Sequence, residues 1–274
     1  MTPQVRHLPR IGRAGLGNEL FPLMRAIEAS QGPSDVFVRP SWFKLRIGPY
    51  IRRERDRREY WRIMRGPRAG DLVVGLLSRT PLRKRMRIQV HSGMGAFFDD
   101  FDFAGRWHRD QLIRLAKYEY PIRFTDCYIA FHVRLGDFAR PAPGLSAESS
   151  NNVSTPLDWY VHAAKLLRAA APGWRIVVCS DGSDEELRAL LGIDGVERNG
   201  PVDALGDILI LAGASLIVGS RSTFSAWGAF LGEVPLIVAP GGNAYQPHSQ
   251  VHEMAIGAAL PTEIHSTLDG ETRN

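Results

Sequence analysis

The sequence contains few cysteines and no long apolar run. Only two cysteines, Cys127 and Cys179, occur in 274 residues, which excludes a disulfide framework and fits a reducing compartment. Both lie in apolar, strand-like runs, so we expect them to be small core residues. No apolar run approaches the roughly 20 residues that cross a bilayer, and residues 1–13 lack the apolar core of a signal peptide. We therefore expect a cytoplasmic protein.

Repeats and low-complexity tracts are also lacking, and the composition is ordinary for a soluble globular protein. Hydrophobic residues make up 44% of the chain and charged residues 23%. The length is sufficient for two modest domains or one large one.

Positive charge is concentrated rather than spread along the chain. The net charge is +5, and clustered arginines favour a polyanionic partner such as phosphate, anionic lipid, an acidic glycan or nucleic acid. A solvated helix face with interleaved acids is the alternative. Aromatic residues that could stack on bases are limited to Tyr60 and Trp61, which disfavours nucleic acid. The densest cluster comprises Arg52, Arg53, Arg55, Arg57, Arg58, Arg62, Arg65 and Arg68.

Short apolar runs alternate with helical patterns, most regularly after residue 127. This alternation predicts an α/β protein with parallel sheets. We expect strands at residues 4–11, 35–38, 72–77, 87–91, 128–133, 175–179, 216–219 and 235–239. We expect helices at residues 19–29, 50–68, 107–118, 155–170, 183–191, 207–214 and 222–231.

Polar side chains follow three of the expected strands. Arg134 follows the first, Ser180 and Asp181 the second, and residues 220–223 (SRST), with Ser222 and Thr223, the third. Parallel strands bring these ends to one edge of the sheet, where such sheets bind ligands. A guanidinium can form two parallel hydrogen bonds to a diphosphate, and the start of a helix adds hydroxyl and backbone donors. The pattern predicts a nucleotide-diphosphate pocket, although a surface turn with an arginine at its tip is the plainer alternative for Arg134.

Several short motifs resemble those of one enzyme family. Residues 132–137 (HVRLGD) resemble the His-x-Arg-Arg-Gly-Asp motif of the α-1,2-fucosyltransferases, glycosyltransferase family 11, and their wider fucosyltransferase relatives. Residues 15–21 (GLGNELF) resemble that family's Gly-x-Gly-Asn-Gln-Leu-Phe. Further similar segments follow in the family's order at residues 156–160 (PLDWY), 178–181 (VCSD), 207–211 (DILIL) and 222–229 (STFSAWGA).

The resemblance implies a GT-B architecture, in which two Rossmann-like domains with parallel sheets face a cleft. Residues 1–122 would form the acceptor-side domain and residues 123–274 the domain that binds GDP-fucose. The family transfers sugar with inversion and without a metal. Asp100 and Asp102 have the spacing of a metal-binding motif, but a solvated acidic loop is the better interpretation.

The same resemblance assigns roles to individual residues. Arg134 would neutralise the β-phosphate as GDP departs, and the base that activates the acceptor hydroxyl would be Asp137 or Glu19. Holding the turn is an equally good role for Asp137. The other donor-binding candidates are Gly15, Gly17, Asn18, His132, Ser180, Asp181, Asp207, Ser222, Thr223 and Phe224.

Three departures from the family pattern leave the donor open. Leu135 replaces the second arginine of the motif, Glu19 replaces a glutamine, and Gly182 replaces an acid. The working hypothesis is a fucosyltransferase that acts on a glycan, with a lipid-linked acceptor and an anionic membrane surface as candidate partners. The alternatives are the same fold with another nucleotide sugar, or a non-catalytic module that binds a nucleotide or an acidic glycan.

Overall fold

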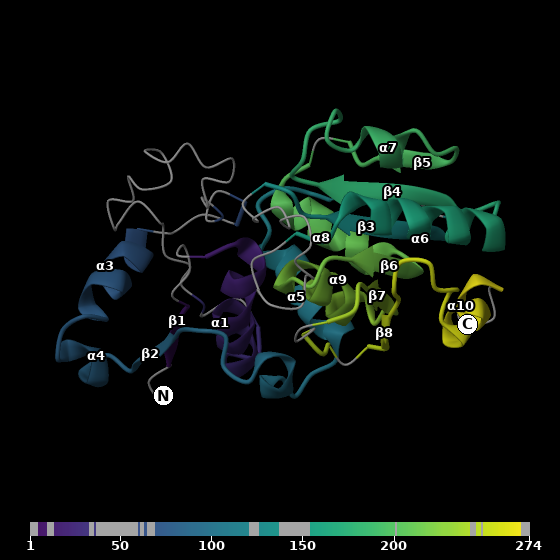
Figure 1. The fold of residues 1–274 in the computed structure, drawn as a ribbon. Coiled ribbons are helices and arrows are strands. Elements are labelled where there is room, and N and C mark those ends of the chain that lie inside the picture. Colours follow the sequence, from purple (N-terminus) through teal and green to yellow (C-terminus); the bar gives the residue numbers. More distant parts are fainter. Residues whose placement is uncertain are drawn as a thin grey trace. The chain divides into compact units, whose positions relative to one another are not determined.

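The protein divides into two compact units, Met1–Tyr120 and Pro121–Asn274 (Figure 1). The expected domain boundary lay between residues 122 and 123. The computed structural model describes residues 5–9, 14–32, 36, 60, 63–64, 69–120, 126–136, 154–200, 202–241, 245–247 and 249–269. Each unit contains helices and parallel strands, so the predicted α/β class is confirmed.

The C-terminal unit is built on a six-stranded parallel sheet in the order β5-β4-β3-β6-β7-β8. The central strand β3 is buried along its whole length, as its continuous apolar run predicted. Sequence patterns missed β5 and β8, which have three residues each and carry charged side chains. The strands are β3 (Tyr128–Val133), β4 (Arg175–Ser180), β5 (Val196–Arg198), β6 (Leu216–Gly219), β7 (Leu236–Val238) and β8 (Val251–Glu253).

Helices cover both faces of this sheet, because side chains alternate along each strand. On one face, Ile129 and Phe131 of β3 pack in a core with α6 (Leu157–Ala170), α7 (Arg188–Leu191) and α10 (Thr262–Leu268). On the other face, Tyr128 and Ala130 pack with α8 (Ala204–Gly213) and α9 (Thr223–Gly232). The result is a doubly wound sheet.

Two of the described helices in this unit start with a side-chain cap. Asp203 precedes α8 and accepts hydrogen bonds from the N–H groups of Leu205 and Gly206, both at 3.0 Å. Ser222 precedes α9 and accepts from the Ser225 N–H. The expected helix at 183–191 is shorter than predicted, because residues 184–187 form turns and only Arg188–Leu191 is helical.

Helices α8 and α9 approach each other closely at a glycine. A Cβ atom added to Gly232 would lie 2.1 Å from the backbone oxygen of Ala212, and backbone cannot move aside as a side chain can. We therefore expect Gly232→Ala to lower the free energy of unfolding by about 1–3 kcal/mol, the usual range for overpacking. Urea denaturation would measure it. The matched control is Gly173→Ala, where a Cβ meets nothing within 4 Å; equal stability of the two variants would contradict the expectation.

The N-terminal unit pairs β1 (Arg6–Pro9) with β2 (Ile88–His91) in parallel, and Val36 bridges to His7. Of the strand expected at 35–38, only Val36 is described. The described part of the arginine-rich segment is Tyr60, Ile63 and Met64, so the helix expected at 50–68 lies outside the described residues. Among the described residues of this unit, the helices are α1 (Leu16–Ala29), α3 (Ala69–Leu77), α4 (Leu82–Arg85), η4 (Phe97–Asp100) and α5 (Gly105–Leu115).

Two expectations about short segments were wrong. Residues 72–77, expected as a strand, belong to helix α3, because a short apolar run fits a half-buried helix as well as a strand. Cys127 is exposed rather than part of the core, since β3 begins one residue later, whereas Cys179 is buried as expected.

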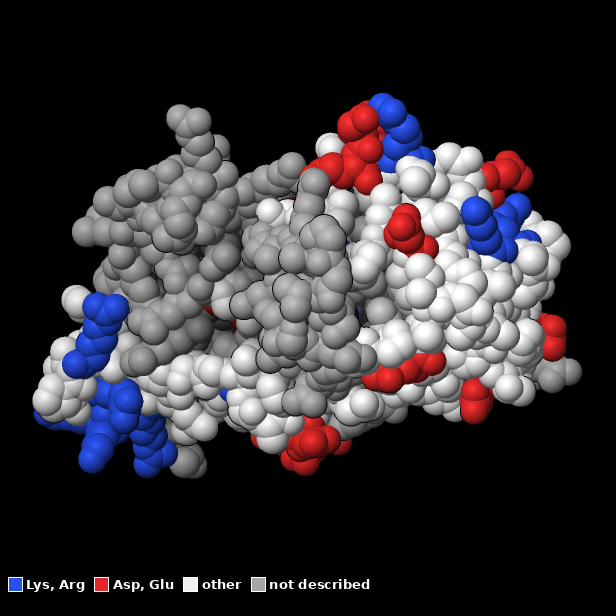
Figure 2. All heavy atoms as spheres, in the orientation of Figure 1, with Lys and Arg blue, Asp and Glu red and all other residues white. Residues whose placement is uncertain are grey.

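Charged groups of the N-terminal unit are organised in two ways. Asp100 forms an ion pair with Arg25 at 2.9 Å, and the same guanidinium donates to the Met94 oxygen. Lys and Arg side chains gather over the α3–α4 region (Figure 2).

Among the described helices, none is both long and apolar enough to cross a membrane.

Candidate nucleotide-binding site

The strand order of the C-terminal sheet reverses between β3 and β6. From β3 the chain crosses to β4 on one side, whereas β6 lies on the other side of β3 and continues to β7. In open parallel sheets, ligands bind outside the carboxyl ends of the strands at such a switch point. The segments that follow β3 and β6 are therefore the place to look for a binding site, and they begin with Arg134 and Ser220.

The turn after β3 is tied to the turn after β4. The Leu135 N–H donates to Oδ1 of Asp181 at 2.8 Å, and the Ser180 hydroxyl donates to the Val133 oxygen at 2.6 Å. The strand register prepares both contacts, because Val133 pairs with Ser180. Since Leu135 is held, the backbone of the turn that carries the preceding half-buried residue, Arg134, is fixed.

Glycines allow these two turns to approach each other. A Cβ atom on Gly136 would lie 2.7 Å from Oδ2 of Asp181, and one on Gly182 would lie 2.7 Å from Cδ1 of Leu135. Leu135 also packs partly buried against the core beside α6. At the position where the family motif has its second arginine, this chain therefore makes an apolar packing contact.

A cation from β5 holds the turn after β4 from its other side. The Nη2 atom of Arg198 donates to the backbone oxygens of Ser180 at 3.0 Å and Gly182 at 2.7 Å. Its other nitrogen forms an ion pair with Asp184. Sequence analysis missed Arg198 because it missed β5, the strand that carries it.

His132 links the end of β3 to α9. Its Nδ1 atom lies 2.7 Å from the Ser225 hydroxyl and 3.2 Å from the Ser220 hydroxyl. The ring stacks on Phe224 with centroids 4.6 Å apart, and the Tyr160 hydroxyl donates to the His132 backbone oxygen at 3.1 Å. The alternation of side chains along β3 places His132 on the sheet face that α9 covers. This alternation was the sequence signal that could have indicated a partner for His132 on α9, such as Ser225.

Burial and, secondarily, the neighbouring Arg134 cation lower the pKa of His132 to about 3. The imidazole is therefore neutral near pH 7, and so weak a base removes few protons from an acceptor. Its contacts fit a residue that holds β3 to α9.

The lowered pKa of His132 makes stability depend on pH. Between pH 6.5 and about 3 the unfolded chain binds a proton that the folded protein does not, so stability falls as pH falls through this window. His132→Asn offers Ser225 a similar polar atom but cannot titrate. We expect this variant to be less stable than wild type at pH 7, with a gap that narrows on acidification by up to about 1.4 kcal/mol per pH unit. Urea denaturation from pH 7 to pH 4 would measure the gap; a constant gap would contradict the assignment.

The start of α9 faces the same edge of the sheet. The Ser222 oxygen accepts from the Ser225 N–H at 3.4 Å and from the Ser220 hydroxyl at 3.1 Å. Thr223 is buried and Phe224 half-buried in the first turn. A helix start presents N–H groups and the positive end of the helix dipole, which together favour an anion.

Asp207 is engaged elsewhere in the C-terminal unit. Its Oδ1 accepts from the Asn199 side chain at 2.8 Å, and burial raises its pKa to about 6 although hydrogen bonds from Asn199 and Cys179 oppose the shift. Its hydrogen-bond partners come from β4 and from the residue after β5, rather than from β3 or β6.

The candidates in the N-terminal unit lie at the start of α1. Gly15 is the N-cap residue, and Gly17 and Asn18 occupy the first turn. Glu19 is buried, and its Oε1 accepts from the Ala14 N–H at 2.6 Å, so this carboxylate closes the glycine loop on the helix. Asp137, the other candidate base, lies outside the described residues.

Within the C-terminal unit, seven of the expected site residues lie at the carboxyl edge of the sheet around the switch point. Sequence analysis assigned no role to three of the groups that hold them there, namely Tyr160, Arg198 and Ser225. The seven are His132, Arg134, Ser180, Asp181, Ser222, Thr223 and Phe224.

The solved structures that resemble this chain include several glycosyltransferases. The E. coli heptosyltransferase WaaC with ADP is 16% identical, with 98% of this chain and 100% of that chain covered and a TM-score of 0.48. The E. coli ADP-heptose lipopolysaccharide heptosyltransferase II is 14% identical, with 98% of this chain and 100% of that chain covered and a TM-score of 0.48. NodZ α-1,6-fucosyltransferase soaked with GDP-fucose is 16% identical, with 86% of this chain and 95% of that chain covered and a TM-score of 0.42.

No protein-family model and no curated protein sequence matches the chain.

Proposed function

We propose that the protein is an inverting glycosyltransferase that binds a nucleotide-diphosphate sugar at the carboxyl edge of its C-terminal sheet. Within that class, the ordered motifs favour an α-1,2-fucosyltransferase of glycosyltransferase family 11, which transfers fucose from GDP-fucose to a hydroxyl of a glycan. The observation that carries the proposal is the position of Arg134, at the end of the central strand and at the switch point of the sheet.

The chemistry follows from two positive groups at one edge. As the acceptor oxygen forms a bond to the anomeric carbon, the bond from that carbon to the β-phosphate oxygen breaks, and the electron pair leaves with the nucleoside diphosphate. The guanidinium of Arg134 neutralises this developing charge with paired donors, and the N-terminus of α9 adds backbone donors. In this scheme, as in the family that the motifs resemble, these groups act without a metal.

A carboxylate must accept the proton that the acceptor hydroxyl releases. Of the two candidates, Glu19 is buried and already accepts a backbone hydrogen bond from Ala14. We therefore favour Asp137, which follows Arg134 by three positions in the sequence.

The identity of the donor is the finer part of the proposal. Leu135 packs against the core where the family motif has a cation, and a site with one fewer positive charge binds a given diphosphate less tightly. The alternative is therefore the same reaction with another nucleotide sugar. The acceptor is a glycan, with a lipid-linked one as a specific candidate, and the setting is the cytoplasm.

A thermal-stability panel tests the proposal. A ligand that binds only the folded protein raises its apparent stability, by about 2.7 kcal/mol at a concentration 100 times Kd. We expect GDP and GDP-fucose to raise the melting temperature of wild type but not of Arg134→Ala. ADP, present in the heptosyltransferase structure, and UDP complete the panel.

Each pattern of results has one meaning. Stabilisation by GDP with fucose transfer to a glycan supports the full proposal. Stabilisation by another nucleotide with transfer of its sugar supports the glycosyltransferase but replaces the donor. Tight nucleotide binding without hydrolysis and without transfer to any glycan supports the non-catalytic alternative. The absence of nucleotide binding overturns both glycosyltransferase proposals and leaves only a module that binds an acidic glycan.

A further inference from the structure

Helix α3 has an exposed apolar side in addition to the side that it buries. Val74 packs with Leu8 and Ile88 in a small core, and Leu77 lies partly buried against it. Val73 and Leu76, three positions apart and so on one side of the helix, are 55% and 57% exposed. Leu82 at the start of α4 is 47% exposed.

The connection between α3 and α4 is a hydrogen-bonded turn rather than a long loop. The Ser78 and Thr80 hydroxyls donate to the Gly75 and Leu77 oxygens at 2.8 and 2.9 Å. The Arg83 N–H donates to the Thr80 oxygen at 3.1 Å. The exposed apolar side chains of both helices are thus presented on a preformed structure.

Cations lie close to these apolar residues in the sequence, and no acidic residue occurs between Asp71 and Asp99. Figure 2 shows the corresponding cluster of Lys and Arg over the α3–α4 region. We call this feature the α3–α4 surface. It consists of Val73, Leu76 and Leu82 together with Arg79, Arg83, Lys84, Arg85 and Arg87, all of which are exposed.

We propose that the α3–α4 surface docks on a lipid bilayer that contains anionic headgroups. Aliphatic side chains gain free energy by leaving water for the acyl boundary, while neighbouring cations are attracted to lipid phosphates. A nucleic acid would satisfy the cations but would leave the aliphatic side chains in water. The described part of this surface also has no aromatic ring on which bases could stack.

Vesicle co-sedimentation tests this proposal without donor or acceptor, so its outcome is separate from that of the proposed transfer reaction. The probes are neutral phosphatidylcholine vesicles and vesicles in which about a third of the lipid is phosphatidylglycerol, since the surface is argued to need anionic headgroups. We expect wild type to bind the anionic vesicles much more strongly, and raising the salt to about 0.5 M to weaken binding.

Two triple variants separate the two components of the surface. Arg83→Ala/Lys84→Ala/Arg85→Ala is expected to lower the partition coefficient on the order of a hundredfold. Val73→Gln/Leu76→Gln/Leu82→Gln is expected to lower it at least about tenfold with all charges retained. The matched control is Ile256→Gln, which alters an exposed aliphatic residue of the other unit, 61% exposed, and should bind as wild type does. Circular dichroism verifies that each variant is folded.

Three results would overturn the proposal. The first is no binding of wild type to anionic vesicles at low salt. The second is equal binding by wild type and the Arg83→Ala/Lys84→Ala/Arg85→Ala variant. The third is that the glutamine variant binds anionic vesicles as wild type does, because the surface would then be a general site for polyanions.

Discussion

Replacing Arg134 with alanine is expected to lower kcat/KM for sugar transfer by about a hundredfold to a thousandfold, the usual loss on removing one group that stabilises developing charge. Arg134 is a half-buried residue that follows the central strand directly, and its turn is fixed by the hydrogen bond from the Leu135 N–H to Asp181. Because the charge on the departing diphosphate is greatest in the transition state, we expect kcat to fall in addition to a weaker binding of the nucleotide. Transfer assays on the purified enzyme and nucleotide titration would measure the two effects.

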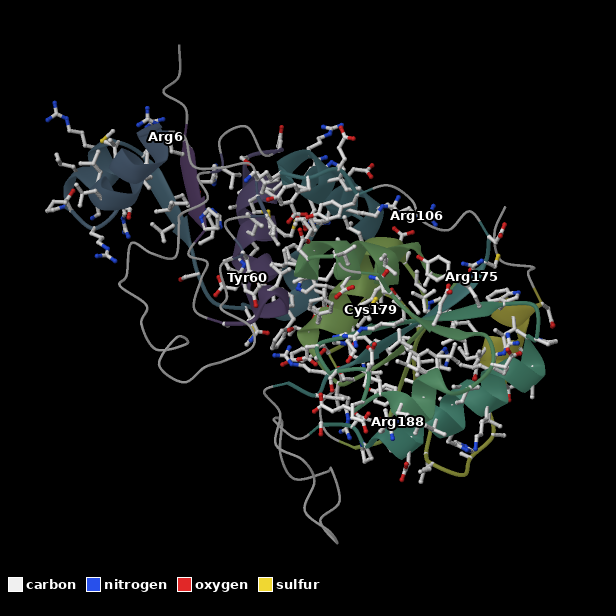
Figure 3. The ribbon with its side chains drawn as sticks, turned by 90° about the horizontal axis from the view of Figure 1, so that it is seen from above. Arg6, Tyr60, Arg106, Arg175, Cys179 and Arg188 are labelled. Carbon is white, nitrogen blue, oxygen red and sulfur yellow. The ribbon has the colours of Figure 1, made fainter. Side chains whose placement is uncertain are left out.

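Matched variants make this test specific. Arg134→Lys keeps the charge but loses the planar fork, so its loss should be smaller than that of alanine yet clearly measurable. Arg175→Ala removes an exposed arginine from the opposite end of the neighbouring strand β4, as the positions of Arg175 and Cys179 in Figure 3 show. It should transfer sugar as wild type does. An Arg134→Ala enzyme with unchanged kcat/KM would remove the basis of the proposed mechanism.

The sequence predicted those parts of the fold that depend on local pattern. The apolar run of β3 and the alternation of strands with helices both have local causes, and together they indicate a parallel sheet with Arg134 at its carboxyl edge. Short elements such as β5 and β8 escaped prediction. Each of these strands has only three residues and includes charged side chains, and it forms only because a neighbouring strand pairs with it.

The supports of the site could not be predicted, because they depend on register and on contacts between distant segments. Arg198 reaches the turn after β4 only because it pairs with Val178 in the sheet. Similarly, Ser225 reaches His132 only after α9 packs on the sheet face that His132 occupies. Composition and motif spacing identify groups that can contact a ligand, whereas the groups that hold them in place emerge from the packed structure.

Substitution of Asp181 is expected to have the second large effect on sugar transfer. Asp181 can either fix the turn that carries Arg134 or bind the nucleoside, and two substitutions distinguish these roles. Its Oδ1 accepts the Leu135 N–H at 2.8 Å and thereby fixes the turn that carries Arg134. Asp181→Ala removes this acceptor, and we expect kcat/KM for transfer to fall by about a hundredfold, as small displacements of a reacting group commonly cause. Asp181→Asn retains an oxygen at the same position and should keep most of kcat. The control is Asp194→Ala, which removes an exposed carboxylate after α7.

Separate measurements of kcat and KM decide which role of Asp181 dominates. If Asp181 acts by fixing the turn, the asparagine variant should resemble wild type and the alanine variant should lose kcat, because the guanidinium is then misplaced as charge develops. If the carboxylate instead binds the nucleoside, both variants should raise KM for the donor to a similar extent and leave kcat nearly unchanged. An equal loss of kcat in both variants would contradict the positioning role, since asparagine still offers Leu135 its acceptor. The hydrogen bond to Leu135 leads us to expect the first pattern.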